Sequence, residues 1–129
     1  MRGLVNISNH PKIVIDTNIF IYIFKNKIAV ERELSNLLGI FELYTTDGVL
    51  NELKRLSNTK WEAKAALQYI ESKRLGIIKT NKNGDESILF VSKMKDTYIL
   101  TNDFNLARKI KSFGGKVIIL KGFKRLDFY

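Results

Sequence analysis

Four acidic residues stand just beyond short apolar segments of the chain, where their carboxylates could meet. They are Asp16 after KIVI (12–15), Glu52 after LYTT (43–46), Asp85 after IIKT (77–80) and Asp103 after YILT (98–101). Carboxylates held close together repel one another, so a cluster of them is costly unless a cation lies among them. The four acids together therefore predict metal-ion chemistry.

Each acid taken singly also has a structural interpretation. Any of the three aspartates could cap the helix that follows it, because an aspartate oxygen accepts hydrogen bonds from the free N–H groups of a helix start. Glu52 could form an exposed ion pair with Lys54 or Arg55. Such roles are the simpler interpretation for one acid, but they do not explain why four acids share one expected edge.

The residue types available restrict the kind of metal. The sequence has no Cys and a single His, His10, which we expect to be structural or exposed to solvent. Carboxylate oxygens without thiolate or imidazole favour Mg²⁺ or Mn²⁺ over zinc. Two such ions can activate a water molecule and stabilise both oxygens of an in-line phosphodiester displacement. We therefore expect a phosphodiester hydrolase.

The segments that would position these acids alternate between strands and helices. Short β-branched runs predict strands, and helical spacing between capping residues and glycines predicts helices. The expected strands are 12–15, 43–46, 77–80, 98–101 and 117–120. One helix is expected directly after Asp16, others at 28–38, 48–56, 61–74 and 85–95, and a last one between Asp103 and Gly114. Asp47 would cap the helix at 48–56, and Asp85 would cap the helix at 85–95. The tail 123–129 would add a short edge strand or pack its aromatic rings on the sheet.

This alternation predicts an α/β three-layer sandwich with a mostly parallel sheet of four to five strands and helices on both faces. The 129 residues are expected to form one domain, 1–129. In such folds, ligands bind beyond the carboxyl ends of the strands. The four acids would lie at that edge.

Charge and composition point to the partner and the compartment. Lys and Arg number 22 against 13 Asp and Glu, a formal net charge of +9. This excess suits a polyanion such as RNA, although solvated helix faces in a lysine-rich proteome would give the same balance. The start of the chain, MRGLVNISNHPK, shows no signal peptide, and the longest apolar segment (13–24) contains Asp16 and is too short to span a bilayer. We expect a cytoplasmic protein with no membrane association.

Four segments of the chain resemble the PIN domain nucleases. They are VIDTNIFI (14–21), VLNELKRL (49–56), GDESILFVSKMKDTYILTND (84–103) and GKVIILKG (115–122), in the order that the family shows. The resemblance implies a divalent-metal-dependent endoribonuclease. It also implies that Asp16, Glu52, Asp85 and Asp103 form the family's acidic quartet and hold Mg²⁺ or Mn²⁺.

The resemblance also assigns supporting residues and partners. Asn18 and Thr101 match polar residues that support the quartet, and Glu86 is a reserve candidate for the third acid beside Asp85. The family includes VapC-type toxins, which pair with an antitoxin protein, and endonucleases that process ribosomal RNA. The ending GKVIILKGFKRLDFY looks more like the processing branch. Family members commonly form homodimers.

Other functions remain open at this point. Asp16 could be the covalent nucleophile of a phosphotransfer enzyme, but Asn18 stands where such enzymes need a second Asp. A receiver-type domain using Asp16 would have an acidic pair before the acceptor strand and a Lys after the last strand. Lys121 fits the second requirement, but no acidic pair precedes Asp16. A PIN-like domain without catalysis could serve as an RNA-binding scaffold, although its acidic quartet would then be unexplained.

Overall fold

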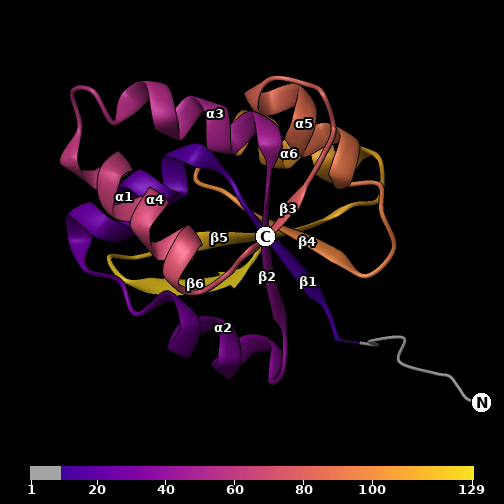
Figure 1. Ribbon diagram of the computed structural model, residues 1–129. Helices are drawn as coiled ribbons and strands as arrows, with labels where there is room; N and C mark the ends of the chain where they lie inside the picture. The colour runs from indigo at the N-terminus through magenta and orange to yellow at the C-terminus, as the bar shows by residue number, and fades with distance from the viewer. Residues whose placement is uncertain (1–9) are drawn as a thin grey trace, which may run out of the picture.

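A computed structural model describes residues 10–129 and shows one six-stranded sheet (Figure 1). The strands are β1 (Lys12–Ile15), β2 (Glu42–Thr46), β3 (Gly76–Ile78), β4 (Thr97–Leu100), β5 (Lys116–Lys121) and β6 (Arg125–Phe128). Their order across the sheet is β3-β2-β1-β4-β5-β6. Neighbouring strands are parallel except for β5 and β6. The expectation about the signal peptide concerns residues that lie mostly outside the described range.

Six helices cover the sheet. They are α1 (Thr17–Asn26), α2 (Val30–Leu38), α3 (Asp47–Leu56), α4 (Trp61–Ser72), α5 (Gly84–Val91) and α6 (Phe104–Ser112). From β1 the chain moves to β2 and β3 on one side, and then to β4 and β5 on the other. Because crossover connections are right-handed, this reversal places α1 to α4 on one face and α5 and α6 on the opposite face. Figure 1 shows α1 beside α4, which pack against each other.

The predicted α/β three-layer fold is confirmed, with a correction to the strand count. The sheet has six strands rather than four or five, because residues 125–128 of the tail pair antiparallel with β5. β1 lies inside the sheet, and its residues Ile13, Val14 and Ile15 are fully buried. A short, continuously apolar run is what a strand covered on both faces requires.

Two of the predicted helix caps were wrong. Thr46, not Asp47, caps α3, and its hydroxyl accepts a hydrogen bond from the N–H of Val49 at 3.0 Å. Asn83, not Asp85, stands at the N-cap of α5, so Asp85 falls within the first helical turn. Both errors have the same cause, since several polar residues precede each helix and local sequence does not say which side chain turns back to the helix.

Helix ends also differ from the prediction. The second helix begins at Val30 rather than Ile28, the fourth ends at Ser72 rather than Arg74, and α5 ends at Val91 rather than Lys95. The last helix, expected to run to Gly114, ends at Ser112, so Phe113 lies beyond it and is exposed. Among residues 10–129, no helix is both long and apolar enough to cross a membrane.

Candidate active site

The reversal of strand order brings the carboxyl ends of β1 and β4 side by side, and we call this place the crevice because folds with such a reversal bind ligands there. At such a point the helices after the two neighbouring strands leave toward opposite faces, which opens a space for a ligand. Asp16 directly follows β1, and Asp103 follows β4 after a short turn. The N–H of Asp16 donates to the carbonyl oxygen of Leu100 at 3.0 Å, which holds the two strand ends together.

Asp16 is buried at this crevice, with 3% of its surface exposed. Its Oδ1 accepts a hydrogen bond from the N–H of Thr17, and its Oδ2 accepts one from the hydroxyl of Thr101, both at 2.8 Å. Burial raises the pKa of Asp16 to about 6, since the two hydrogen bonds only partly offset the lost hydration and repulsion from Asp85 and Glu52 adds to the rise. The site therefore holds a carboxylate whose negative charge is not neutralised by the protein.

Thr101 connects the first acid to the last. Its side chain is fully buried, donates to Asp16, and accepts the backbone N–H of Asp103 at 3.0 Å. Asp103 caps α6, because its Oδ1 accepts the N–H of Leu106 at 3.1 Å. The predicted capping role of Asp103 is thus present together with its place at the crevice.

Glu52 reaches the same edge from α3. Its Oε1 accepts a hydrogen bond from the hydroxyl of Thr17 at 2.7 Å. Its Oε2 lies 3.7 Å from the guanidinium of Arg55, one of the two exposed pairings that the sequence suggested. Gly84 allows this approach, because a Cβ there would lie 3.1 Å from Oε1 of Glu52.

Asp85 occupies the first turn of α5 and is exposed. Partial burial raises the pKa of its carboxyl, and repulsion from Asp103 and Glu52 raises it further, while the cation of Lys109 opposes the rise. Asp16 is likewise repelled by Asp85 and Glu52. The four predicted acids therefore act on one another electrostatically, although they come from four separate segments of the chain.

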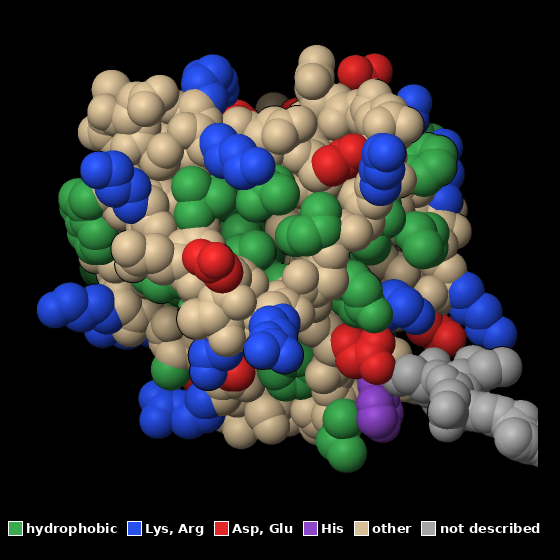
Figure 2. All heavy atoms as spheres, viewed as in Figure 1, with side chains coloured by type: hydrophobic (Ala, Val, Ile, Leu, Met, Phe, Trp, Pro, Cys, Tyr) green, Lys and Arg blue, Asp and Glu red, His purple; other side chains and the backbone are tan. Residues whose placement is uncertain are grey.

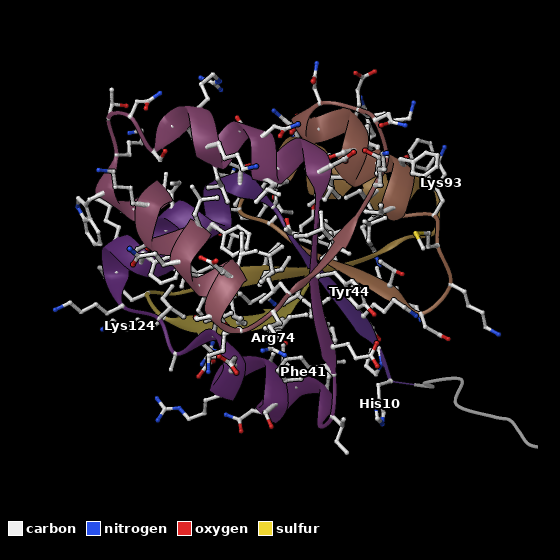
Figure 3. All side chains as sticks on the ribbon, in the orientation of Figure 1. His10, Phe41, Tyr44, Arg74, Lys93 and Lys124 are labelled. Carbon is white, nitrogen blue, oxygen red and sulfur yellow. The ribbon has the colours of Figure 1, made fainter. Side chains whose placement is uncertain are left out.

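The other predicted residues lie farther from this set. Asn18 is exposed on α1, and within residues 10–129 its side chain makes no hydrogen bond to the four acids. Glu86 is exposed on α5 and is not among the charges that shift the pKa of Asp85. His10 is exposed beside the start of β1, at the end of the strand opposite Asp16 (Figure 3). Asp85 thus interacts electrostatically with two of the other acids, whereas Glu86 is not among the charges that act on it.

The side chains do not form a closed metal cage. In the described part of the chain, no three Asp, Glu or His side chains come close enough together to hold one ion. Three of the four acids have protein partners for their oxygens instead, namely Thr17, Thr101, Leu106 and Arg55. A hollow of about 680 Å³ adjoins the set and is lined by Glu52, Asp85 and five neighbours.

Asp47 lies one strand away and binds four donors. Its Oδ1 accepts the N–H of Gly48 at 2.8 Å and the hydroxyl of Thr80 at 2.7 Å. Its Oδ2 accepts the N–H groups of Thr80 at 2.9 Å and Asn81 at 2.8 Å. Burial alone would raise the pKa of Asp47, but these hydrogen bonds outweigh it and lower the pKa to about 2. The carboxylate thereby ties the start of α3 to the loop that leads into α5.

Thr46 and Gly48 strengthen this connection, and we call Thr46, Asp47 and Gly48 the loop clamp. The hydroxyl oxygens of Thr46 and Ser87 share a hydrogen bond at 2.7 Å, which joins β2 to α5. A Cβ on Gly48 would lie 2.5 Å from the carbonyl oxygen of Lys82, so only glycine permits the loop to approach this closely. The loop clamp fixes the segment that carries Asp85.

Sequence reasoning missed Thr17 and the loop clamp. Thr17 follows Asp16 directly, and its place beside a candidate acid was the only available signal. Asp47 was noted only as a helix cap, since its partners Thr80 and Asn81 are more than thirty residues away in the chain.

The chain is similar to proteins of known family. The family described as PIN like domain matches residues 13–123. Ribonuclease VapC9 of Archaeoglobus fulgidus is 31% identical over 118 residues, covering 88% of this chain and 85% of the relative. Ribonuclease VapC4 of Methanocaldococcus jannaschii is 31% identical over 127 residues, covering 92% of this chain and 96% of the relative.

Solved structures share the fold at lower sequence identity. The PIN domain endonuclease Utp24 superposes with a TM-score of 0.76 at 22% identity, and 92% of each chain is covered. A domain of a functionally unknown protein from Methanocaldococcus jannaschii gives a TM-score of 0.64 at 16% identity, covering 87% of this chain and 92% of the other. These likenesses concern the fold alone.

Proposed function

The chain belongs to the PIN like domain family, and on this premise we propose that it is an endoribonuclease that cuts single-stranded RNA at the carboxyl edge of its sheet. One observation carries the proposal. Four carboxylates converge on that edge from four segments, and repulsion among them raises the pKa values of Asp16 and Asp85. They belong to Asp16, Glu52, Asp85 and Asp103. A protein seldom gathers uncompensated acids in a cleft unless the cleft binds a cation or moves protons.

Mg²⁺ or Mn²⁺ is the cofactor that fits these donors. The acids offer only hard oxygen atoms, and Asp16 combines burial with a raised pKa, which a nearby divalent cation would lower. Because the carboxylates do not surround a single point, we propose that Asp16, Glu52, Asp85 and Asp103 hold the metal partly through water. A bound ion supplies Lewis-acid chemistry, activating water and neutralising charge on the phosphodiester.

The chain's own residues orient this chemistry. Thr17 and Thr101 hold Asp16 and Glu52 in place through short hydrogen bonds, so these carboxylates need little reorganisation when substrate binds. Arg55 beside Glu52, and Lys109 near Asp85, supply positive charge that suits the phosphates of the substrate. Asn18 and Glu86 are proposed as supporting residues at the rim of the same site.

The alternative roles for Asp16 do not fit its surroundings. A phosphotransfer enzyme of this kind needs a second Asp two residues after its nucleophile, and Asn18 stands there. A receiver domain needs an acidic pair before its acceptor site, and no acidic residue precedes Asp16 in the sequence. A scaffold that binds RNA without cutting it would not need four carboxylates that repel one another at this edge.

The function is tested by incubating the full chain with labelled single-stranded RNA and with Mg²⁺, Mn²⁺ or EDTA. Water attacks phosphorus, the bond to the 3′ oxygen breaks, and the products carry a 5′-phosphate and a 3′-hydroxyl. Asp103→Asn should fold and keep its cap, because Asn caps a helix about as well as Asp, but it should lose cleavage. Products with a 2′,3′-cyclic phosphate, or full activity in EDTA, would contradict the proposal.

The sequence relatives favour a toxin setting over RNA maturation. Ribonucleases named VapC9 and VapC4 match nearly the whole chain, while the likeness to Utp24 concerns the fold. We propose a cytoplasmic, single-domain VapC-type toxin that forms a homodimer and is held inactive by an antitoxin. Expression of the chain in a bacterial host should arrest growth, and the reading frame directly upstream of its gene should encode a small protein whose co-expression restores growth. Unimpaired growth with active enzyme present would favour RNA processing instead.

A further inference from the structure

Two pairs of lysine and phenylalanine lie along and beyond α5, outside the candidate active site. The ammonium of Lys82 is 5.6 Å from the ring centre of Phe90, and the ammonium of Lys93 is 5.0 Å from the ring centre of Phe113. Phe90 and Phe113 are 50% and 56% exposed. We call these four residues the α5 stripe.

The α5 stripe is built from alternating positive charges and open rings. A cation near an aromatic ring is attracted by the ring's electron-rich face and holds that ring in a defined place. Each half-exposed ring also keeps surface on which a planar group can stack. Lysines interleaved with exposed rings are the combination by which proteins bind single-stranded nucleic acid, with cations for phosphates and rings for bases.

One end of the α5 stripe adjoins the candidate active site. Lys82 directly precedes Asn83, the N-cap of α5, and Asp85 lies in the first turn of that helix. The hollow of about 680 Å³ beside the acids is lined by Asn83, Gly84 and Asp85. Lys82 therefore adjoins this hollow along the chain, and its contact with Phe90 offers a neighbouring surface to a strand whose phosphodiester lies at the acids.

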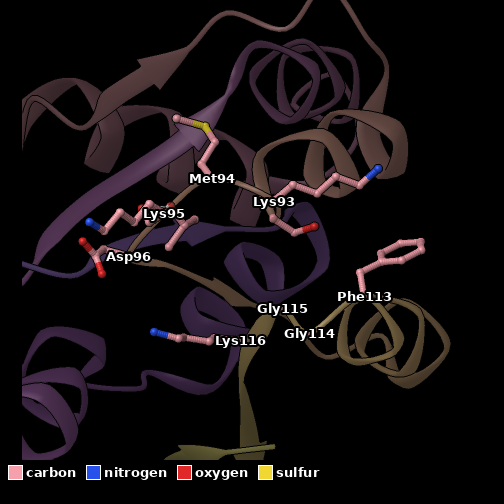
Figure 4. Close-up of a pocket in the computed structure, with 10 residues that line it drawn as sticks. Lys93, Met94, Lys95, Asp96, Phe113, Gly114, Gly115 and Lys116 are labelled. Carbon is pink, nitrogen blue, oxygen red and sulfur yellow. Dashed lines mark hydrogen bonds between the residues drawn. The ribbon is translucent and has the colours of Figure 1, made fainter.

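The other end of the α5 stripe opens into a second hollow, of about 330 Å³, beyond the end of α5 (Figure 4). Lys93 and Phe113 line it side by side, as Figure 4 shows, and Figure 3 places Lys93 at the far end of α5. Lys95 and Lys116 add two cations to this hollow, against one carboxylate, that of Asp96. An eight-residue helix spans roughly 12 Å, so the two hollows are a few nucleotides apart.

The pairing of cations with exposed rings indicates which kind of molecule binds the α5 stripe. The chain carries a formal net charge of +9, and Figure 2 shows Lys and Arg side chains spread over the face in view rather than gathered in one patch. What distinguishes the α5 stripe is therefore the pairing of its lysines with exposed rings, not charge alone. A protein partner would not need open ring faces between cations, whereas an unpaired RNA strand offers one base and one phosphate in each repeat.

We infer that the α5 stripe binds the single-stranded RNA on one side of the cleaved bond, an inference that rests on the proposed function. Bases stack on Phe90 and Phe113, and Lys82 and Lys93 neutralise phosphates. Duplex RNA does not fit this surface, because its base faces are covered by their neighbours in the stack. The α5 stripe thus makes the enzyme prefer unpaired RNA independently of the acids that cut it.

Binding and cleavage are measured separately. Affinity for a fluorescein-labelled single-stranded RNA of mixed sequence is determined by fluorescence anisotropy in the Asp103→Asn background, with the probe checked for integrity on a gel. Phe90→Ala and Phe113→Ala should each weaken binding by roughly tenfold, the lower range for loss of one stacked base. Affinity for the same RNA annealed to its complement should change little.

The lysines have a different readout. Lys82→Gln or Lys93→Gln should reduce the slope of log affinity against log salt by about 0.7, the contribution of one neutralised phosphate on a single strand. Trp61→Ala and Lys64→Gln are matched controls, an exposed ring and an exposed lysine on α4. Both controls should bind the single-stranded RNA as the parent protein does.

The outcomes distinguish this inference from the proposed function. If Phe90→Ala/Phe113→Ala binds single-stranded RNA as tightly as its parent, the inference is wrong, even if the wild type cuts RNA. If that variant loses affinity while the wild type cuts no RNA, the α5 stripe binds RNA as inferred and the proposed catalytic function is wrong. Should an alanine variant melt at a lower temperature, Phe90→Leu and Phe113→Leu keep apolar bulk, and unchanged affinity in them overturns the inference equally.

Discussion

Asp16 and Asp47 each stand at the end of a parallel strand of the same sheet, yet their carboxylates have opposite surroundings. Asp16 at the end of β1 is buried beside other acids, and its pKa is raised to about 6. Asp47 at the end of β2 accepts four hydrogen bonds, and its pKa is lowered to about 2. The first carboxylate is held at a cost to the fold, and the second stabilises it. The surroundings of the carboxylate, rather than the residue type, therefore distinguish the proposed ligand site at Asp16 from the structural loop clamp at Asp47.

Replacing Asp16 should give the largest effect. Asp16→Asn removes a proposed metal ligand, so cleavage should fall by at least about 100-fold. The metal-free variant should be no less stable than the wild type at pH 7, because a buried, repelled charge is gone. Melting temperature and cleavage rate, measured with and without Mg²⁺, check this. If the Asp16→Asn protein cleaved RNA as fast as the wild type, the proposed role of Asp16 as a metal ligand would be wrong.

The two carboxylates should also divide the pH dependence of stability. The folded pKa of Asp16, about 6, exceeds the ordinary value of 3.8, so the folded state holds the extra proton and the metal-free protein loses stability as pH rises from about 4 to 6. That loss is at most about 3 kcal/mol. The folded pKa of Asp47, about 2, is lower than 3.8, so its stabilisation is present above pH 4 and is lost as pH falls toward 2.

Urea unfolding in EDTA from about pH 2 to 7 tests this division. Asp16→Asn should reduce the change in the free energy of unfolding between about pH 4 and 6, the upper limb of the pH profile. Asp47→Asn should reduce the change below about pH 4, the lower limb. If either variant changed the limb assigned to the other, the contrast between the two aspartates would be wrong. Exposed acids contribute to both limbs, so each variant is compared with the wild type at every pH.

Asp47→Asn should have a smaller effect than Asp16→Asn on cleavage but a larger one on the fold. The new amide NH₂ would face the N–H groups of Thr80 and Asn81, leaving donors without an acceptor at a cost of about 1–3 kcal/mol. Cleavage should drop only several-fold, because Asp85 is less well positioned but still present. Asp127→Asn, which removes an exposed ion pair with Lys121, is the matched control and should change stability little.

Glu86→Gln should have the smallest effect. Glu86 neighbours Asp85 but is exposed and belongs neither to the charges that act on Asp85 nor to the loop clamp. Stability and cleavage should stay close to wild type, while Asp85→Asn should lose cleavage. The reverse order of these two variants would assign the third acid to Glu86.

The parts of the fold that local pattern determines were predictable from sequence. KIVI followed by Asp16 reads as a buried strand and a cap, and both features are present. The parallel arrangement then brought the strand ends to one edge. This is why acids as distant as Asp16 and Asp103 could be assigned to one site before their contacts through Thr101 were known.

Features that depend on distant partners were not predictable. Asp47 looked like a helix cap because nothing nearby reveals that its oxygens bond to Thr80 and Asn81. The α5 stripe was missed for the same reason, since Lys93 meets Phe113 only after β4 and α6 have brought the two together.

The hydrogen bond between Thr101 and Asp16 spans 85 residues and has a consequence for synthesis. Contacts between such distant positions form only after the intervening chain has been made, and they fold more slowly than local ones. A ribosome-bound chain that has released β1 to α4 has neither β4 nor Asp103, so it cannot assemble the crevice. The order of the acids along the gene therefore withholds nuclease activity from a nascent chain until β4 and Asp103 have left the ribosome.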